Sequence, residues 1–382
     1  MSIYFDYTAS GLLDPEVLDL YVEALKKFNY NPASLHHDGR ECRLAIEEAR
    51  CRMAAVLDCE AEEIIFTSGG SESINTALKS VTIESRRRGR KLVSDAAEHP
   101  ATMETLRFLE TAEKRQVDFL PLKDGRYDLS ALRASLEDSA ADLISSLYVH
   151  NENGMIYPLA EIKALRDELC PSAKWHVDAV QALGKVPISF KNIGADFMSF
   201  SLHKIGAPKG IGLLLARRNL RLCPLIHGGG QQGGRRSGTE NPPLIIASAL
   251  AMEKSAKTLE QNWSRVSALK TLLLERLKAS SQPFREVSDA RSVPHIVLLL
   301  FPGLRAQTLQ NGLSERGLDL SIGSACASTK DADPALIALG LSADESRHAV
   351  RISLSAQTRE EDIERLVHEI DDLLTRFGGA EH

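Results

Sequence analysis

Seven short apolar runs alternate with helix-like stretches between about residue 60 and residue 220, and this alternation constrains the fold more than any other feature. The runs indicate buried strands, because they are almost continuously apolar and end at Gly, Pro, Asn or charged residues. They cover 62–68, 90–96, 116–122, 142–149, 174–179, 196–201 and 210–218. Helix candidates lie between them at 71–87, 100–113, 129–137 and 159–169. Such alternation predicts an α/β fold with a mostly parallel seven-stranded sheet covered by helices.

The last third of the chain has a different pattern, which predicts a small α+β unit. Its final helix begins near Thr358, which forms a T-x-x-E capping box with Glu361. Because 382 residues exceed one ordinary hydrophobic core, we expect a large domain at 15–255 and a small domain built from 1–14 and 256–382. The elements expected in the last third are a long polar helical segment at about 243–278, an apolar run at 293–301, a helix near 305–316 and an apolar run at 348–355.

Composition and charge exclude several classes of function. A net charge of −6 and a pI near 6.0 give no general attraction to nucleic acid or to an anionic membrane. No apolar run approaches the ~20 residues that span a bilayer, and the first residues do not resemble a signal peptide. The six cysteines are scattered without zinc-binding spacing, so we expect no metal site. The expectation is a cytoplasmic protein that binds neither nucleic acid nor membrane.

Two charged side chains follow predicted strands directly. Lys204, in FSLHKIGAPKGIG, precedes a Gly/Pro-rich loop, and Asp178, in KWHVDAVQ, ends another strand. Ligands of α/β sheets bind at such strand ends. A lysine there can form a Schiff base with a carbonyl compound, although a surface lysine in a turn is the alternative. A buried carboxylate such as that of Asp178 needs a cationic or hydrogen-bonding partner, and the protonated ring nitrogen of pyridoxal phosphate would be one. The alternative is that Asp178 only caps a helix.

Three more strand ends carry polar groups. In FTSGGSES a strand leads through Gly70 and Ser71 into a helix, where free N–H groups can hold a phosphate. His99 could stack on a planar ring or relay protons, and Asn151 could bond a phenolic oxygen. Each of these residues alone is more often a helix cap than a ligand. Five strand ends, each suited to a different part of one cofactor, favour a cofactor site.

Three residues outside the predicted sheet complete the candidates. Thr239, in the Gly-rich segment 228–242, could bind an anion, with a flexible surface loop as the alternative. Arg351, in VRISLS, has a planar guanidinium that suits a substrate carboxylate, with a surface salt bridge as the alternative. Cys326, in SIGSACAS, is either a reactive thiol on a loop of small residues or a small buried hydrophobe.

Taken together, these motifs closely resemble those of the cysteine desulfurases, pyridoxal-phosphate enzymes of fold type I in the class V aminotransferase group. SIGSACAS is similar to the cysteine loop of the branch with the longer, mobile loop. His150 stands where the family has the first Asn of an Asn-Asn pair, and Ser71 where it commonly has Thr. The similarity covers nearly the whole chain, in order, through YFDYTAS, NPASLHHDGR, FTSGGSES, AEHPA, HNENG, HVDAVQ, SLHKIGAPKGIG, RRSGTEN and SIGSACAS.

The resemblance implies pyridoxal 5'-phosphate as the cofactor and a role for each candidate. Lys204 would be the Schiff-base lysine and proton shuttle, Asp178 would face the ring nitrogen, and His99 would lie over the ring. The remaining implied roles are Asn151 and Gln181 at the ring oxygen, Gly70, Ser71, Ser201 and His203 at the phosphate, Thr239 of the second subunit of a homodimer at the same phosphate, and Arg351 at the carboxylate of the substrate.

The implied activity is removal of sulfur from L-cysteine, giving L-alanine and a persulfide on Cys326. The Cys326 thiolate would attack the substrate sulfur, with His99 as a candidate acceptor of the thiol proton. A sulfur-acceptor or scaffold protein, for example in iron-sulfur cluster assembly, would then receive the sulfur. The alternatives are a selenocysteine lyase or a related class V aminotransferase or lyase, and, in a different class, a non-catalytic sulfur-transfer scaffold.

Overall fold

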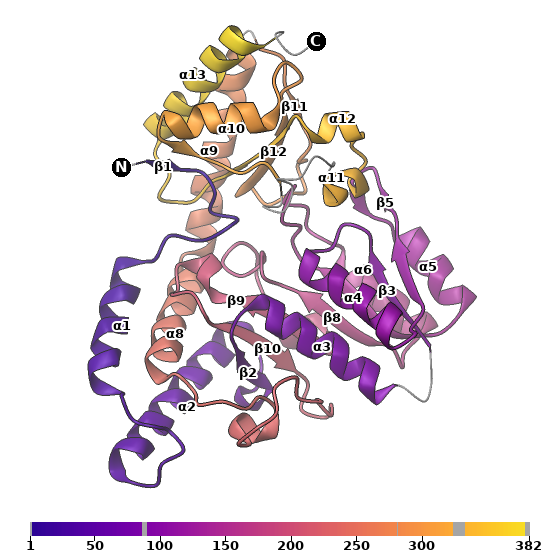
Figure 1. The fold of residues 1–382 in the computed structure, drawn as a ribbon, viewed down its shortest axis with the longest axis vertical. Helices are drawn as coiled ribbons and strands as arrows, with labels where there is room; N and C mark the ends of the chain where they lie inside the picture. Colours follow the sequence, from indigo (N-terminus) through magenta and orange to yellow (C-terminus); the bar gives the residue numbers. More distant parts are fainter. Residues whose placement is uncertain (1, 86–89, 281, 324–332, 379–382) are drawn as a thin grey trace.

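The computed structural model describes residues 2–85, 90–280, 282–323 and 333–378, and Figure 1 shows how their elements are arranged. A seven-stranded sheet lies in the lower part of that view. β10 runs antiparallel to both of its neighbours, and the other neighbouring strands pair in parallel. The prediction of a mostly parallel seven-stranded sheet is therefore confirmed. In spatial order the strands are β2 (Ile64–Thr67), β10 (Gly212–Ala216), β9 (Phe197–Ser201), β8 (Lys174–Asp178), β7 (Ala141–Leu147), β3 (Lys91–Asp95) and β4 (Val117–Leu120).

Helices cover both faces of the sheet, because successive strand residues point to opposite sides and nearly all of them are apolar. Ile65 of β2 packs with α3 (Gly70–Glu84) and α4 (Pro100–Ala112) on one face. Its neighbour Ile64 packs into the larger core on the other face. The helices of that second face are α1 (Pro15–Lys27), α2 (His37–Leu57), α5 (Leu129–Asp138), α6 (Leu159–Leu169) and α8 (Pro242–Lys257).

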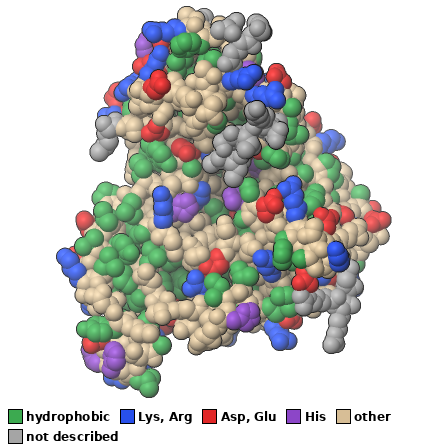
Figure 2. All heavy atoms as spheres, in the orientation of Figure 1, with side chains coloured by type: hydrophobic (Ala, Val, Ile, Leu, Met, Phe, Trp, Pro, Cys, Tyr) green, Lys and Arg blue, Asp and Glu red, His purple; other side chains and the backbone are tan. Residues whose placement is uncertain are grey.

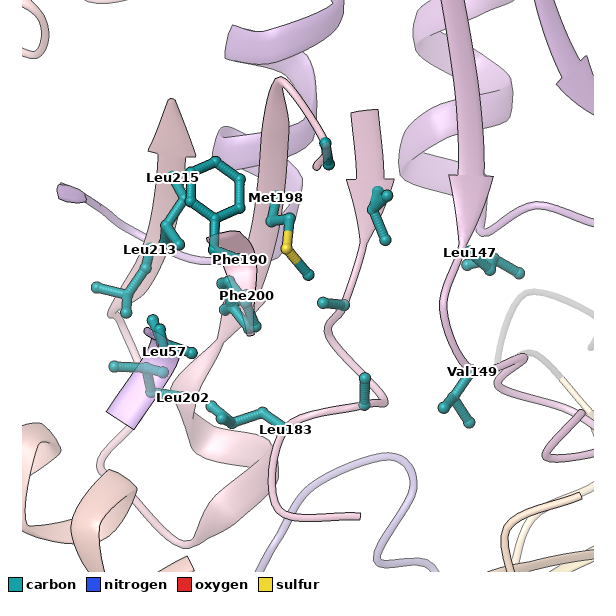
Figure 3. Packing of buried hydrophobic residues seen from close by; sticks show 14 of the residues in the cluster. Leu57, Leu147, Val149, Leu183, Phe190, Met198, Phe200, Leu202, Leu213 and Leu215 are labelled. Atoms are coloured by element: carbon teal, nitrogen blue, oxygen red, sulfur yellow. The ribbon is translucent and has the colours of Figure 1, made fainter. Parts of the chain in front are cut away.

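Figure 3 shows part of the larger core, where β9 and β10 lie side by side. Phe200 is opposite Leu213 and Met198 is opposite Leu215 in the antiparallel register, and all four side chains are fully buried. Burying each of them contributes about 1.5–3 kcal/mol of hydrophobic free energy. This packing fixes the end of β9, after which the chain enters the short 3-10 helix η2 (Leu202–Ile205) that contains Lys204.

The upper part of Figure 1 contains a three-stranded antiparallel sheet, formed by β11 (Arg285–Glu286), β12 (Ile296–Leu300) and β14 (Ala349–Ser353). The N-terminal strand β1 (Ile3–Tyr4) pairs in parallel with β13 (Leu318–Asp319) in this same part. The domain limits expected from the sequence stay a prediction. The helices packed here are α9 (Leu259–Ala279), α10 (Ala306–Glu315) and α13 (Glu360–Phe377).

The predicted helical segment at 243–278 consists of two helices. Thr258, with φ −101° and ψ 6°, ends α8, and α9 begins at the next residue. Within the residues that the structure describes, no helix combines the length and the apolar character needed to cross a lipid bilayer. The remaining short elements are η1 (Ala61–Glu63), β5 (Leu122–Lys123), β6 (Arg126–Tyr127), α7 (Phe190–Ile193), η3 (Gln231–Gly234), α11 (Pro334–Ala338) and α12 (Ala343–Ser346).

The capping box predicted for the last helix is wrong. The carboxylate of Asp362, not that of Glu361, accepts a hydrogen bond from the N–H of Arg359, at 3.0 Å, so Arg359 is the N-cap of α13. The hydroxyl of Thr358 accepts instead from the N–H of Ser355, at 3.1 Å. Thr358 therefore closes the preceding turn, and the helix starts one residue later than the sequence pattern indicates.

Candidate active site

A cavity of about 190 Å³ opens at the carboxyl ends of the central strands. Five strand ends, those of β2, β3, β7, β8 and β9, contribute side chains to its wall. Its apolar lining comes from Ile74, Leu147 and Val149, together with Val180. Nine candidates from the sequence line the same cavity: Gly70, Ser71, His99, Asn151, Asp178, Gln181, Ser201, His203 and Lys204.

The amine of Lys204 lies between this cavity and the N-terminal segment. Its Nζ donates hydrogen bonds to the carbonyl oxygens of Thr8, at 2.7 Å, and Ala9, at 2.8 Å. Burial, and next the positive charge of Arg351, lower the pKa of Lys204 to about 8. A substantial fraction of this amine is therefore neutral near physiological pH, which is the form that attacks a carbonyl carbon.

Asp178 is a buried carboxylate at the end of β8, only 3% exposed. One of its oxygens accepts a hydrogen bond from the N–H of Val180, at 2.9 Å, and no ion pair with a described residue neutralises it. Burial raises the pKa of Asp178 to about 6. A buried acid in this position gains most from a cationic N–H donor inside the cavity, so it fits a protonated pyridine nitrogen.

The N-terminus of α3 forms a narrow cradle at the cavity. A Cβ on Gly70 would lie 2.9 Å from the Cγ2 of Val180, so a larger residue would not fit without moving its neighbour. The buried hydroxyls of Thr67 and Ser73, 2.8 Å apart, hold this turn together. First-turn N–H groups of a helix attract anions. The cradle therefore fits a phosphate group.

His99 caps α4 with its imidazole. Its Nδ1 accepts a hydrogen bond from the N–H of Ala101, at 3.1 Å. Burial, and next the charges of Lys204 and Arg351, lower the pKa of His99 to about 4. The ring is therefore neutral near pH 7, and because Nδ1 is an acceptor, its proton lies on Nε2. In this state His99 can donate a hydrogen bond to a group in the cavity.

His150 connects the loop before His99 to the loop after β7. Its Nε2 donates to the carbonyl oxygen of Ala97, at 3.1 Å, and its Nδ1 accepts from the N–H of Glu152, at 3.1 Å. Burial lowers the pKa of His150 to about 4. A neutral histidine thus fills the position where the resemblance leads one to expect Asn.

Arg351, on β14, lies beside the cavity and is only 5% exposed. Its Nη1 donates to Glu152 at 3.0 Å and to the carbonyl oxygen of Asn151 at 3.1 Å. Its Nη2 donates to Asp6 at 3.3 Å and to the hydroxyl of Ser321 at 3.1 Å, while Nε has no partner among the described residues. Two carboxylates therefore balance its charge in this structure.

Besides Arg351, which bonds to Asn151 of the wall, two further candidates are absent from the lining of the cavity. Thr239 is exposed and lies outside the wall. Cys326 lies outside the described residues, so nothing is concluded about its position. The described residues on either side of its segment lie close together, because a Cβ on Gly323 would be 2.9 Å from the carboxylate of Asp333. Ser321, just before, contacts Arg351.

Sequence reasoning missed Thr8, Asp6 and Glu152. Thr8 contributes a backbone carbonyl, to which both Lys204 and the side-chain amide of Gln181 donate. A backbone acceptor has no signature in the sequence. Asp6 and Glu152 belong to YFDYTAS and HNENG, two motifs on which the resemblance rests, and their acidic side chains were the available signal.

Comparisons with known proteins identify the family of the chain. The model of the aminotransferase class-V family matches residues 3–366. "Cysteine desulfurase IscS" of Dictyoglomus turgidum is 32% identical over 98% of this chain and 95% of its own length. "Putative cysteine desulfurase IscS 1" of Bacillus subtilis is 32% identical over 98% of this chain and 99% of its own length.

Two solved structures extend the similarity to the fold. A "NifS-like protein" superposes with a TM-score of 0.92 at 32% identity, covering 98% of this chain and all of the other. "SspA in complex with cysteine" superposes with a TM-score of 0.81 at 30% identity, covering 93% of this chain and 99% of the other. The chain belongs to the class-V aminotransferase family and, within it, to the pyridoxal-phosphate-dependent cysteine desulfurases.

Proposed function

We propose that this chain removes the sulfur atom of L-cysteine, releases L-alanine and carries the sulfur as a persulfide on Cys326. The observation that carries the proposal is the meeting of nine candidate residues around one cavity, with the Lys204 amine in its wall. Family membership gives the class of reaction, and the cavity supplies the groups that this reaction needs.

The cavity holds pyridoxal phosphate in this proposal. Gly70, Ser71, Ser201 and His203 hold its phosphate, Asn151 and Gln181 its ring oxygen, and Asp178 its ring nitrogen. When bound, the cofactor supplies an electron sink that stabilises negative charge on the Cα of the amino acid. Lys204 would bind the aldehyde carbon of the cofactor, and its free amine would move the proton at the Cα of the amino acid.

Sulfur transfer is the step that requires Cys326. Its thiolate attacks the sulfur of the substrate, the substrate C–S bond breaks with its electron pair on carbon, and that carbon takes up a proton. His99, in the wall of the cavity, would donate a hydrogen bond from Nε2 to a group bound there. The hydrogen bond from Ala101 to Nδ1 implies that the proton of His99 is on Nε2. His99 could accept the thiol proton only by giving up this bond, so we assign it first as a hydrogen-bond donor.

Arg351 binds the carboxylate of the substrate in this proposal. Because Glu152 and Asp6 already share its guanidinium, the carboxylate competes with Asp6, whose ion pair at 3.3 Å is the longer of the two. Burial raises the pKa of Asp6, which is consistent with a weakly held carboxylate.

We also propose a homodimer. Leu18, Val22 and Leu25 form an exposed apolar stripe at helical spacing on α1, and Leu35, 81% exposed, lies between α1 and α2. Figure 2 shows apolar side chains gathered over this region at the lower left. Exposed apolar patches of this kind mark protein interfaces. We propose that the second copy contributes its own Thr239 to the cofactor phosphate, the role that the family resemblance implies.

Mixing inactive variants tests the homodimer. Lys204→Ala and Thr239→Val chains are co-expressed, and the assembly mass is measured by light scattering. If Thr239 acts on the cavity of the other subunit, the mixed dimer regains activity, since one of its two cavities has both residues. A monomeric mass, or no recovery in the mixed assembly, contradicts the proposal.

The cellular setting is a further proposal. We infer a cytoplasmic enzyme that passes its sulfur to an acceptor or scaffold protein of iron-sulfur cluster biogenesis. The support is indirect and comes from the names of the relatives and from the reduced thiol that the chemistry requires.

Mass spectrometry after incubation with L-cysteine and pyridoxal phosphate tests the activity itself. The peptide that contains Cys326 should gain one sulfur atom, and Lys204→Ala should prevent this gain. Sulfide release at the wild-type rate by Cys326→Ser would instead favour a lyase that needs no thiol. A protein that gains no visible Schiff-base absorbance with pyridoxal phosphate would favour the non-catalytic scaffold.

A further inference from the structure

A second, larger cavity of about 330 Å³ lies next to the first, lined by the N-terminal segment, the loop after β8, helices α8 and α9 and the loop after β14. Lys204 lines both cavities, so its side chain stands in the wall between them. Cavities of this size at the boundary between two parts of a chain are common ligand sites. None of the groups assigned above to cofactor or substrate, apart from Lys204, lines this second cavity.

Two further lysines in its wall differ in their partners. The ammonium of Lys254 lies 2.7 Å from Asp14 and 2.7 Å from Glu16, so its charge is balanced. Lys185 is only 8% exposed and has no carboxylate partner among the described residues. Its Nζ donates a single hydrogen bond, to Oε1 of Gln181, at 3.3 Å. Burial, and next the charge of Lys204, lower the pKa of Lys185 to about 7, so a bound anion would stabilise its protonated form. When Lys185 is protonated, two of its three donor positions remain for a ligand.

A histidine from the upper part of the molecule lines the same cavity. His295 is 7% exposed, and its Nδ1 has no hydrogen-bond partner among the described residues. Its ring packs edge-on against Trp263, with centroids 6.3 Å apart. Burial, and next the charge of Lys185, lower the pKa of His295 to about 3, so the ring is neutral and lies near the ammonium. An unpaired buried ring nitrogen is destabilising unless a ligand or water bonds to it.

We propose that this second cavity binds a small anion, a carboxylate or an oxyanion, between the ammonium of Lys185 and the imidazole of His295. An anion supplies the countercharge that protonated Lys185 lacks, and His295 lies in the same wall. The residues that line the cavity favour a negatively charged ligand. Asp14, the one acidic residue among the described residues of this lining, is already paired with Lys254. The site is separate from the chemistry on Cys326 and does not depend on it.

A hydrogen-bonded chain connects this site to the cofactor lysine. Lys185 donates to Gln181, Gln181 donates through Nε2 to the carbonyl oxygen of Thr8 at 3.0 Å, and Lys204 donates to that same oxygen. The bond from Lys185 to Oε1 also fixes the orientation of the Gln181 amide and turns its Nε2 to the shared carbonyl. A bound anion that accepts a hydrogen bond from Lys185 would therefore alter the hydrogen bonds of Gln181 and of the Thr8 carbonyl that Lys204 shares.

Calorimetric titration of the cofactor-loaded protein with inorganic phosphate, and separately with acetate, tests the proposal at constant ionic strength. We expect saturable binding of one anion per chain. Lys185→Met should weaken it by at least about tenfold, because a charge-assisted hydrogen bond is lost. Lys254→Met is the matched control and should change the affinity by less than about threefold, because its ammonium is committed to two carboxylates.

Arg351→Lys separates this site from the substrate site. Binding that disappears in Arg351→Lys and persists in Lys185→Met would overturn the proposal, as would the absence of saturable heat in the wild-type protein. His295→Phe gives a second test if Lys185→Met folds poorly, because it removes the ring nitrogen and keeps the packing against Trp263; unchanged affinity there contradicts the proposal. A wild-type chain that binds anions through Lys185 but forms no persulfide would refute only the proposed function.

Discussion

The carboxylate of Glu152 lies 3.0 Å from the guanidinium of Arg351, and both side chains are buried. The two residues come from β14 and from the loop after β7, which are far apart in the sequence. Removing one member of a buried pair leaves the other charge without compensation, which is the costly case. Arg351 variants therefore have two separable effects, one on substrate binding and one on folding.

Arg351→Ala should lower the free energy of unfolding by about 3 kcal/mol, because Glu152 is left buried without its main cation. The double variant Glu152→Gln with Arg351→Ala should recover part of this loss. Urea unfolding of the single and double variants measures the coupling. Additive effects would show that the pair does not stabilise the fold. The KM for L-cysteine should be high in both the single and the double Arg351 variant, because both lack the guanidinium proposed to bind the substrate.

Two buried histidines should lower the stability of the protein as the pH falls from about 6.5 to about 4, and buried carboxyls such as Asp95 oppose this effect. The pKa of His150 is lowered by burial from 6.5 to about 4, and burial lowers the pKa of His176 to about 3. In the unfolded chain these histidines take up protons near pH 6.5, whereas in the folded protein they stay neutral. The stability that the neutral histidines contribute is therefore complete above pH 6.5 and is lost as the pH falls toward their pKa values in the folded protein. Asp178, whose pKa is raised to about 6, acts with the opposite sign.

The variant His150→Asn isolates one of these protons. Each buried histidine that charges on unfolding adds about 1.4 kcal/mol per pH unit to the slope of stability against pH. Urea unfolding between pH 4 and pH 7 should give a slope smaller by one proton in the variant. An unchanged slope would mean that His150 is protonated in the folded protein.

His99→Asn should separate capping from chemistry. Asn is a good N-cap, so the free energy of unfolding should change by less than about 0.5 kcal/mol. Sulfur transfer should fall by about 100-fold or more, because the imidazole proton donor is lost. Denaturant unfolding and alanine formation provide the two readouts. Activity near the wild-type level would remove His99 from the catalytic residues.

Gly70→Ala should weaken binding of pyridoxal phosphate by about tenfold, the effect of losing one charge-assisted hydrogen bond at the cradle. The added Cβ meets Val180 at 2.9 Å. Gly303→Ala is the matched control, since the nearest atoms to its added Cβ are 4.0 Å away. Equilibrium dialysis of the cofactor compares the two variants, and equal affinities would argue against the cradle.

The central sheet could be predicted from the sequence because its strands are buried on both faces and therefore read as continuous apolar runs. The strand-end residues could be predicted for the same reason, since Lys204 and Asp178 directly follow such runs. The partners of Arg351 could not, because Asp6, Glu152 and Ser321 come from three distant segments. The capping box predicted at Thr358 is wrong because Glu361 and Asp362 can each accept a hydrogen bond from the first residues of the helix. The sequence alone does not indicate which of the two does so.

The pairing of β1 with β13 has a consequence for how the chain is made. Phe5 accepts a hydrogen bond from Ser353, and Ile3 lies beside Leu318, so the segment that presents the Thr8 carbonyl to Lys204 is held by strands near the other end of the chain. During synthesis, residues 3–5 leave the ribosome long before residues 317–319 and 353, with which they pair. A growing chain that has not yet reached residue 353 therefore contains Lys204 without the segment that surrounds its amine.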